Sequence, residues 1–334
     1  MNRKLIAISL TVFLSFSFLP LVAEGAGEIK TFHIVDDLEF TGKPPGTGKD
    51  KPSDGGSTQP AQKLPWGVDR IDAELVSFTG KEIKVAVLDT GIDSDHPDLN
   101  VAGGINFIQS GRTVDPSKWD DDNGHGTHVA GTIGALDNDI GVVGVAPGVS
   151  LYAVKVLDRR GSGSLTGVIN GIKWAADNGM DIISMSLSTD YDYQELEDAC
   201  DYAFNMGVVI VAAAGNDGSS VDYPAAYSSV IAVSATTSSD SLAYFSNRGN
   251  QIELSAPGVN IESTWIDGGY NTISGTSMAC PHVSGVAALV LEWDGTLSPS
   301  GVRNSLRDAE NLGDDSGWDN FFGYGLVDAQ AATS

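Results

Sequence analysis

The sequence has few basic residues and few cysteines. Its 334 residues include 19 Lys and Arg against 44 Asp and Glu, for a net charge of −25. A surface this acidic repels nucleic-acid phosphates and anionic membranes, which excludes both as partners. The two cysteines, Cys200 and Cys280, are too few for a disulfide scaffold. A single bridge and two buried free thiols both remain open.

Beyond its first 22 residues the sequence lacks long hydrophobic runs. Arg3 and Lys4 precede an apolar run at 5–22, and small residues follow it. This order is typical of a secretory signal peptide, so residues 1–26 are predicted to be removed and the protein to be secreted. An uncleaved membrane anchor is the alternative, because the run is close to the length that spans a bilayer.

The next segment, 27–60, is predicted to be a short pro-segment and linker. A short strand is expected at 29–35, and residues 42–60 are rich in Gly, Pro, Lys and Ser without a core-forming pattern. Fewer than 40 residues are too few for an independent folding unit. The globular domain is predicted at 61–334.

Short apolar runs alternate with helical patterns through this domain. Buried strands are predicted at 83–89, 150–158, 180–187, 207–215 and 230–235. Helices are predicted at 125–136, 165–178, 193–206, 277–293 and 299–307. Strands that are apolar on both faces and separated by helices indicate an α/β fold, with a mostly parallel central sheet covered by helices on both faces.

Three polar residues stand at the ends of such elements. Asp89 ends a predicted strand, and His125 and Ser277 each begin a predicted helix. A serine hydroxyl needs an imidazole base to become a nucleophile, and a carboxylate orients that imidazole. The three residues are therefore predicted to form a catalytic triad for acyl transfer. Asn216, after another strand, is predicted to form an oxyanion hole with the Ser277 N–H, although Asn after Gly is also a common turn residue.

Four motifs around these residues resemble the subtilisin-like serine proteases. They are DTGIDSDHPDL, NGHGTHVAGT, AAAGN and GTSMACPHVSG, in this order. The resemblance covers roughly residues 61–332 and implies a three-layer subtilisin-like fold and a broad serine endopeptidase that acts on polypeptides. It implies that Asp89 orients, His125 is the base and Ser277 attacks. It gives no chemical role to His128 or His282, and His33 and His96 are expected to lie outside the site.

The resemblance also implies a substrate cleft. RGSGS at 160–164 and MSLST at 185–189 resemble the two segments that pair with an extended substrate backbone, a largely sequence-blind mode of binding. Ser188 stands where the family has glycine and is expected to narrow the primary pocket. The implied substrate-binding residues are Ser162, Gly163, Ser186, Leu187, Ser188, Ala214, Gly215 and Asp222.

Asp222 directly precedes Tyr223 and Pro224, which resemble a Tyr-Pro pair that the family has beside the base of this pocket. A carboxylate at that position favours Lys or Arg at the cleaved residue, in addition to large apolar residues, and Asp217 adds to the negative field. In the alternative interpretation, Asp222 turns to solvent.

The stretch ALDNDIGVVGVAP, 135–147, resembles the calcium loop of the family. The implied oxygen ligands, which suit Ca²⁺ and not zinc, are Gln62, Asp98, Leu136, Asn138, Ile140 and Val142. Such an ion stabilises the fold. Asp115 and residues 120–122 are a further acidic cluster, for which a solvated loop and a second ion site both remain open.

Two rival functions share this fold. A peptide-binding or calcium-binding protein without catalysis is expected to lack a member of the triad, and none is missing here. A related acid-active peptidase class carries Glu and Asp in place of His125 and Asn216. The sequence therefore favours a monomeric secreted endopeptidase active at neutral to alkaline pH.

Overall fold

The computed structural model describes residues 31–34, 59–110, 113–313 and 317–334. The predicted signal peptide and most of the predicted linker lie outside the described residues. Within the described ranges, no helix is both long enough and apolar enough to cross a bilayer.

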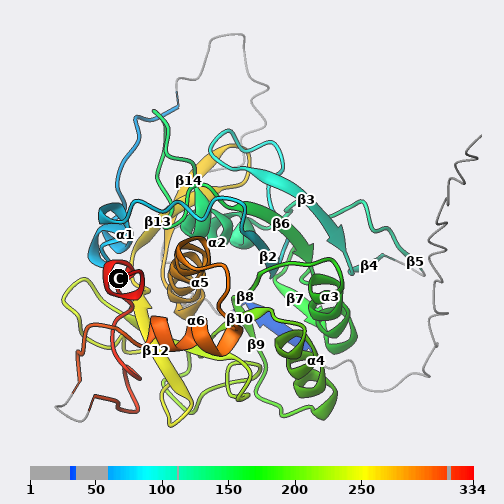
Figure 1. Cartoon of the computed structure of the whole chain (residues 1–334). Coiled ribbons are helices and arrows are strands. Elements are labelled where there is room, and N and C mark those ends of the chain that lie inside the picture. Colours follow the sequence, from blue (N-terminus) through cyan, green and yellow to red (C-terminus); the bar gives the residue numbers. More distant parts are fainter. Residues whose placement is uncertain (1–30, 35–58, 111–112, 314–316) are drawn as a thin grey trace, which may run out of the picture.

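A seven-stranded parallel sheet forms the centre of the domain (Figure 1). Its order is β12-β11-β10-β8-β2-β6-β3, and each neighbouring pair runs parallel. The strands are β2 (Lys84–Asp89), β3 (Val101–Asn106), β6 (Ser150–Lys155), β8 (Ile182–Met185), β10 (Val209–Ala213), β11 (Ile231–Thr236) and β12 (Ile252–Pro257).

Helices cover both faces of this sheet, which confirms the predicted fold class (Figure 1). One face packs against α2 (His125–Gly134) and α5 (Thr276–Trp293), with α6 (Pro299–Leu306) beside α5. The other face packs against α3 (Leu165–Asp177) and α4 (Gln194–Asn205).

The buried strand β2 shows why its sequence is apolar at every position. Val85 and Val87 belong to the hydrophobic cluster on the α2 and α5 side, whereas Ala86 and Leu88 belong to the cluster on the α3 and α4 side. Successive side chains of a strand point to opposite faces, so a strand covered on both sides needs no polar alternation.

The short elements lie around this core. They are α1 (Trp66–Arg70), η1 (Ala73–Leu75), α7 (Ala329–Ala332), the pair β4 (Gln109–Ser110) and β5 (Thr113–Val114), and the hairpin β13 (Ile261–Trp265) and β14 (Gly269–Ile273). A separate three-stranded sheet has the order β7-β1-β9. Its strands are β1 (Thr31–Ile34), β7 (Ser162–Ser164) and β9 (Leu187–Ser188).

The five predicted central strands and five predicted helices are confirmed, with ends shifted by up to three residues. The predicted strand at 29–35 corresponds to β1. The edge strands β3 and β12 and the hairpin were not predicted. In β3 the run VAGGIN contains two glycines and is only partly buried, so it lacks the continuous apolar pattern of a central strand.

Candidate active site

Asp89 and His125 form a buried pair at the carboxyl end of the sheet. Asp89 is the last residue of β2 and His125 is the first residue of α2, and both side chains are fully buried. His125 Nδ1 donates to Asp89 Oδ1 at 2.8 Å. Burial raises the pKa of Asp89, while the contact with His125 and the N–H of Thr90 act in the opposite direction. The carboxylate thus fixes the imidazole in one orientation.

Ser277 lies in the first turn of α5, which packs against α2. Its Oγ donates to the carbonyl oxygen of Ser186 at 3.1 Å, and Ser186 Oγ donates to the carbonyl oxygen of Ser277 at 2.8 Å. Pro281 contributes to this arrangement. Proline has no N–H, so it cannot donate to the carbonyl four residues earlier, that of Ser277.

Asn216 lies beside the start of the same helix. Its Oδ1 accepts from both the N–H and the Oγ1 of Thr276, at 3.0 and 2.9 Å. Because both partners donate, the amide oxygen must face Thr276, which assigns the orientation of the amide. Its Nδ2 is buried and has no hydrogen-bond partner among the described residues. A buried amide donor without a partner is suited to a developing oxyanion.

Most of the other histidines have structural contacts. Burial lowers the pKa of His282 to about 4, so its ring is neutral at physiological pH. His96 packs edge-on against Tyr270. The rings donate to backbone carbonyl oxygens as follows: His96 Nε2 to Gly269, His128 Nε2 to Ile261 and His282 Nδ1 to Met278.

The expectation that His33 lies outside the site is wrong. His33 belongs to β1, which pairs antiparallel with β7 on one side and β9 on the other. Phe32 lies opposite Gly163 and is fully buried, and His33 lies opposite both Ser162 and Ser188. The strands β7 and β9 lie within the two segments expected to bind substrate, so the chain's own upstream strand lies between them. The histidine was misplaced because its partners are more than 120 residues away in sequence.

Asp222 does not turn to solvent. Its side chain is 8% exposed, and its Oδ2 accepts from Ser188 Oγ at 3.0 Å. A Cβ added to Gly215 would lie 2.3 Å from the same carboxylate oxygen. The carboxylate therefore sits between the 186–188 and 214–216 segments. Burial raises the pKa of Asp222 to about 6, with smaller contributions from Asp190 and Asp217.

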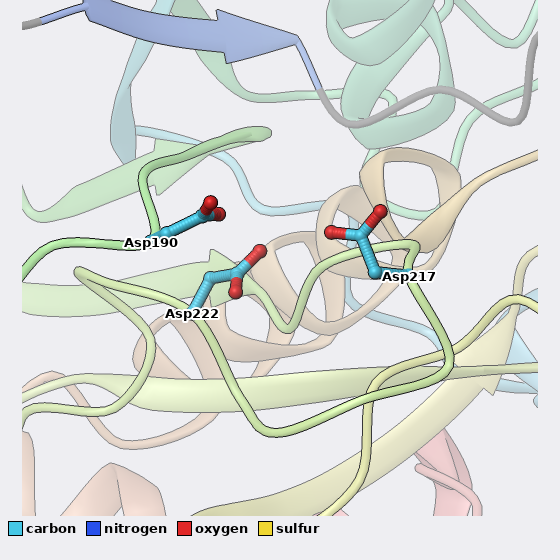
Figure 2. Close-up of side chains that lie close together, drawn as sticks. All are labelled: Asp190, Asp217 and Asp222. Atoms are coloured by element: carbon cyan, nitrogen blue, oxygen red, sulfur yellow. The ribbon is translucent and has the colours of Figure 1, made fainter.

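Asp222, Asp190 and Asp217 form an acidic cluster (Figure 2). Each offers a carboxylate oxygen, and these oxygens lie within 4.8 Å of one another. Asp190 and Asp217 are exposed, whereas Asp222 is buried. Asp190 was missed because it follows the segment 185–189 by one residue, outside the matched motif.

The predicted calcium ligands come together around the loop after α2. Ala61 and Ile140, and Lys63 and Val142, form β-bridges that lay the 60–63 segment along this loop. The polar contacts between the predicted ligands are Asn138 Nδ2 to Asp98 Oδ1 at 2.8 Å, Asn138 N to Gln62 Oε1 at 2.5 Å and Val142 N to Asp98 Oδ2 at 3.0 Å.

The carboxylates of the second acidic cluster form hydrogen bonds and an ion pair with neighbouring protein groups. Asp115 accepts from Ser117, and Asp120 accepts from Ser94. Asp122 pairs with Lys155 at 2.6 Å. Asp121 is buried and surrounded by protein donors. The open question of the cysteines is also answered: Cys200 and Cys280 are both buried free thiols.

Comparison with known proteins agrees with this geometry. Residues 80–325 match the peptidase family described as the subtilase family. Subtilisin E of Bacillus subtilis (strain 168) is 48% identical over 281 residues, which cover 81% of this chain and 72% of that protein. Subtilisin DY of Bacillus licheniformis is 48% identical over 281 residues, covering 81% and 99%. M-protease of Shouchella clausii (strain KSM-K16) is 48% identical over 281 residues, covering 83% and 71%. The chain therefore belongs to the subtilase family and is a subtilisin-like serine endopeptidase.

Proposed function

We propose that this endopeptidase works through Asp89, His125 and Ser277. His125 takes the proton of the Ser277 hydroxyl as Ser277 attacks the peptide carbonyl, and then gives that proton to the leaving amine. Water then hydrolyses the acyl-enzyme by the same base. The observation that carries this assignment is the buried 2.8 Å bond between His125 Nδ1 and Asp89 Oδ1. It leaves Nε2 as the ring nitrogen for proton transfer.

Asn216 is the side-chain donor of the proposed oxyanion hole. Its amide oxygen is held by Thr276 and its buried Nδ2 has no partner among the described residues. The start of α5 adds backbone N–H groups and the positive end of a helix dipole next to Ser277. Both features stabilise negative charge on the tetrahedral intermediate more than they stabilise the neutral substrate.

The substrate is an extended polypeptide that adds a strand between β7 and β9. The strand β1 supports this proposal, because it already lies antiparallel to both. Its register runs from Thr31 opposite Ser164 to Ile34 opposite Leu187, the residue that follows Ser186. Ser186 in turn exchanges hydrogen bonds with Ser277. Main-chain pairing of this kind gives broad specificity.

Residues 27–60 act as a short pro-segment, of which the strand β1 blocks the cleft. A substrate strand and β1 need the same edges of β7 and β9, so β1 has to leave before a substrate binds. Phe32 anchors β1, because its ring is fully buried in the cluster with Leu157 and Leu187.

The primary pocket accepts Lys or Arg as well as large apolar residues. Asp222, between the two walls of the pocket, supplies a buried negative charge, and Asp190 and Asp217 extend the negative field at the cleft. A positively charged side chain relieves the repulsion among the three carboxylates.

A structural calcium ion binds at the loop after α2. Asp98 is fully buried, and carboxylate, amide and backbone oxygens suit a hard cation. The proposed ligands are Gln62, Asp98, Leu136, Asn138, Ile140 and Val142. When bound, the ion joins the 60–63 segment to the loop and stabilises the native state. It takes no part in the chemical step.

The signal sequence and the acidic surface support a secreted, monomeric enzyme without nucleic-acid or stable membrane partners. The decisive test of the proposed function is labelling with a fluorophosphonate in the presence of calcium. Mass spectrometry should place the adduct on Ser277 alone, and Ser277→Ala should remove both the adduct and the peptidase activity. A folded, calcium-loaded Phe32→Ala protein, in which β1 no longer blocks the cleft, that remains unlabelled would contradict the proposal and favour a binding protein.

A further inference from the structure

The first turn of α2, which carries His125, is capped by side chains from outside the helix. Gly124 at the N-cap has φ 113° and no side chain, so it cannot accept from the first amide groups. Side chains of three other residues accept hydrogen bonds from these amide groups instead. The contacts are His125 N to Asn123 Oδ1 at 3.0 Å, Gly126 N to Thr90 Oγ1 at 2.9 Å and Thr127 N to Asp121 Oδ2 at 3.0 Å.

Asp121 is the central acceptor of this arrangement. Its side chain is buried, and both of its oxygens accept hydrogen bonds. Oδ1 accepts from Thr90 Oγ1 at 2.9 Å, Asn123 N at 2.9 Å and Gly124 N at 3.0 Å. Oδ2 accepts from Thr127 N at 3.0 Å and Thr127 Oγ1 at 2.6 Å. A single carboxylate therefore holds the turn before His125 and the first helical turn after it.

Thr90 connects that carboxylate to the other half of the catalytic pair. It directly follows Asp89, and its N–H donates to Asp89 Oδ1 at 2.7 Å. Its hydroxyl accepts from Gly126 N and donates to Asp121. One hydroxyl thus joins the residue after Asp89 to the residue after His125.

Lys155, on the neighbouring strand β6, adds two contacts to this network. It lies opposite Asp89 in the β2 and β6 pairing, and its side chain is 7% exposed. Its ammonium donates to the carbonyl oxygen of Thr90 and to Asp122 Oδ1. Thr90 and Lys155 therefore each connect the end of β2 to the turn that precedes α2.

We propose that Asp121 and Thr90 are positioning residues for the general base. Asp89 and His125 come from different elements, and helix ends are the parts of helices that fray most easily. The Asp121 and Thr90 contacts fix the start of α2 against the end of β2, and so fix the imidazole against its carboxylate. Misplacement of a catalytic group by about 1 Å is enough to slow a reaction by about a hundredfold. This inference rests on the proposed role of His125.

An amide is a poor substitute for Asp121 because all five of its partners donate. Asn offers one acceptor oxygen and turns an NH₂ group toward donors. Thr90→Val likewise keeps the shape of the side chain but removes a hydroxyl that both donates and accepts. Thr90→Ser keeps that hydroxyl.

The test compares Asp121→Asn, Thr90→Val and Thr90→Ser in the full chain with calcium, each in the Phe32→Ala background, in which β1 no longer blocks the cleft. We expect kcat to fall about tenfold to a hundredfold in Asp121→Asn and Thr90→Val. KM should change less than about threefold, because the hydrogen bonds of the two side chains join the end of β2 to the start of α2. Thr90→Ser should restore most of kcat. Asp328→Asn is the matched control, since Asp328 caps the distant helix α7 through Ala331 N at 2.8 Å; its kcat should not change.

The downfield proton resonance of the His125 Nδ1–H···Asp89 bond gives a second readout. It should weaken or broaden in Asp121→Asn and Thr90→Val and remain in Thr90→Ser and Asp328→Asn. Circular dichroism checks that each variant folds. If Asp121→Asn does not fold, the comparison of Thr90→Val with Thr90→Ser still tests the inference. Folded variants with wild-type kcat and resonance would overturn the inference. Its failure is distinct from that of the proposed function, which Ser277→Ala tests separately.

Discussion

Ser186 and Ser277 hold each other by two hydrogen bonds, in which the Oγ of each donates to the carbonyl oxygen of the other, at 2.8 and 3.1 Å. Ser186 lies between β8 and β9, and β9 is one of the two strands proposed to pair with the substrate. The proposed nucleophile is therefore tied directly to the segment that is expected to hold the substrate. Pro281 favours this link, because it has no N–H to donate to the Ser277 carbonyl four residues earlier.

Ser186→Ala should lower both stability and kcat. The change leaves the buried Ser277 carbonyl without this donor, which costs about 1–3 kcal/mol. The looser Ser277 should reduce kcat several-fold. Thermal unfolding and steady-state kinetics measure the two effects.

Ser284→Ala is the control for this prediction. Ser284 is buried on the same helix and donates to Ser184 Oγ and to the Cys280 carbonyl, one turn from Pro281. It should lower stability without an equal loss of kcat. Equal kinetic losses in both variants would show that the Ser186 bond has no special role.

The preference for basic residues should depend on pH through Asp222. Its pKa is raised to about 6, so the carboxylate is charged above pH 6 and neutral below it. The ratio of kcat/KM for an Arg substrate to that for a Phe substrate should fall as the pH drops from 8 to 5. We expect a change of about tenfold, which corresponds to roughly 1.4 kcal/mol.

The pH dependence of groups that affect both substrates equally cancels in this ratio. Asp222→Asn should lower the ratio at pH 8 and make it independent of pH. Asp95→Asn, at an exposed position outside the cleft, is the charge-matched control. A ratio that stays constant with pH in the wild type would refute the pocket assignment.

The sequence predicted the parts of the molecule that local patterns determine. Asp89, His125 and Ser277 follow apolar runs or begin helical ones, and the structure places each at such an element end. The sequence left open whether the Asp222 carboxylate faces the pocket or the solvent, because its position depends on Ser188, 34 residues away. The roles of Asp121 and Thr90 were not predicted, since an acidic run in a loop resembles a solvated surface until the fold encloses it.

Phe32→Ala should free the cleft for substrate. Loss of a buried aromatic ring weakens the seating of β1 between β7 and β9, whereas the exposed His33 ring contributes less. In a Ser277→Ala background, which prevents processing, a fluorescent peptide should bind at least tenfold more tightly to Phe32→Ala than to the parent. His33→Ala should change this affinity only slightly. Equal peptide affinities in all three proteins would argue against occlusion of the cleft by β1.

Removal of calcium should destabilise the protein and detach the 60–63 segment. A ligand that binds only the native state at about a hundred times its dissociation constant stabilises it by about 2.7 kcal/mol. In the Ser277→Ala background, which excludes self-digestion, a chelator should lower the midpoint of thermal unfolding and added calcium should restore it. Asp98→Asn should abolish this response because it removes the buried carboxylate among the proposed ligands. Asp95→Asn, exposed and three residues earlier, should keep the response. A parent protein whose midpoint is the same with chelator and with calcium would contradict the metal assignment, since the bridges of Ala61 to Ile140 and Lys63 to Val142 would then hold the segment without an ion.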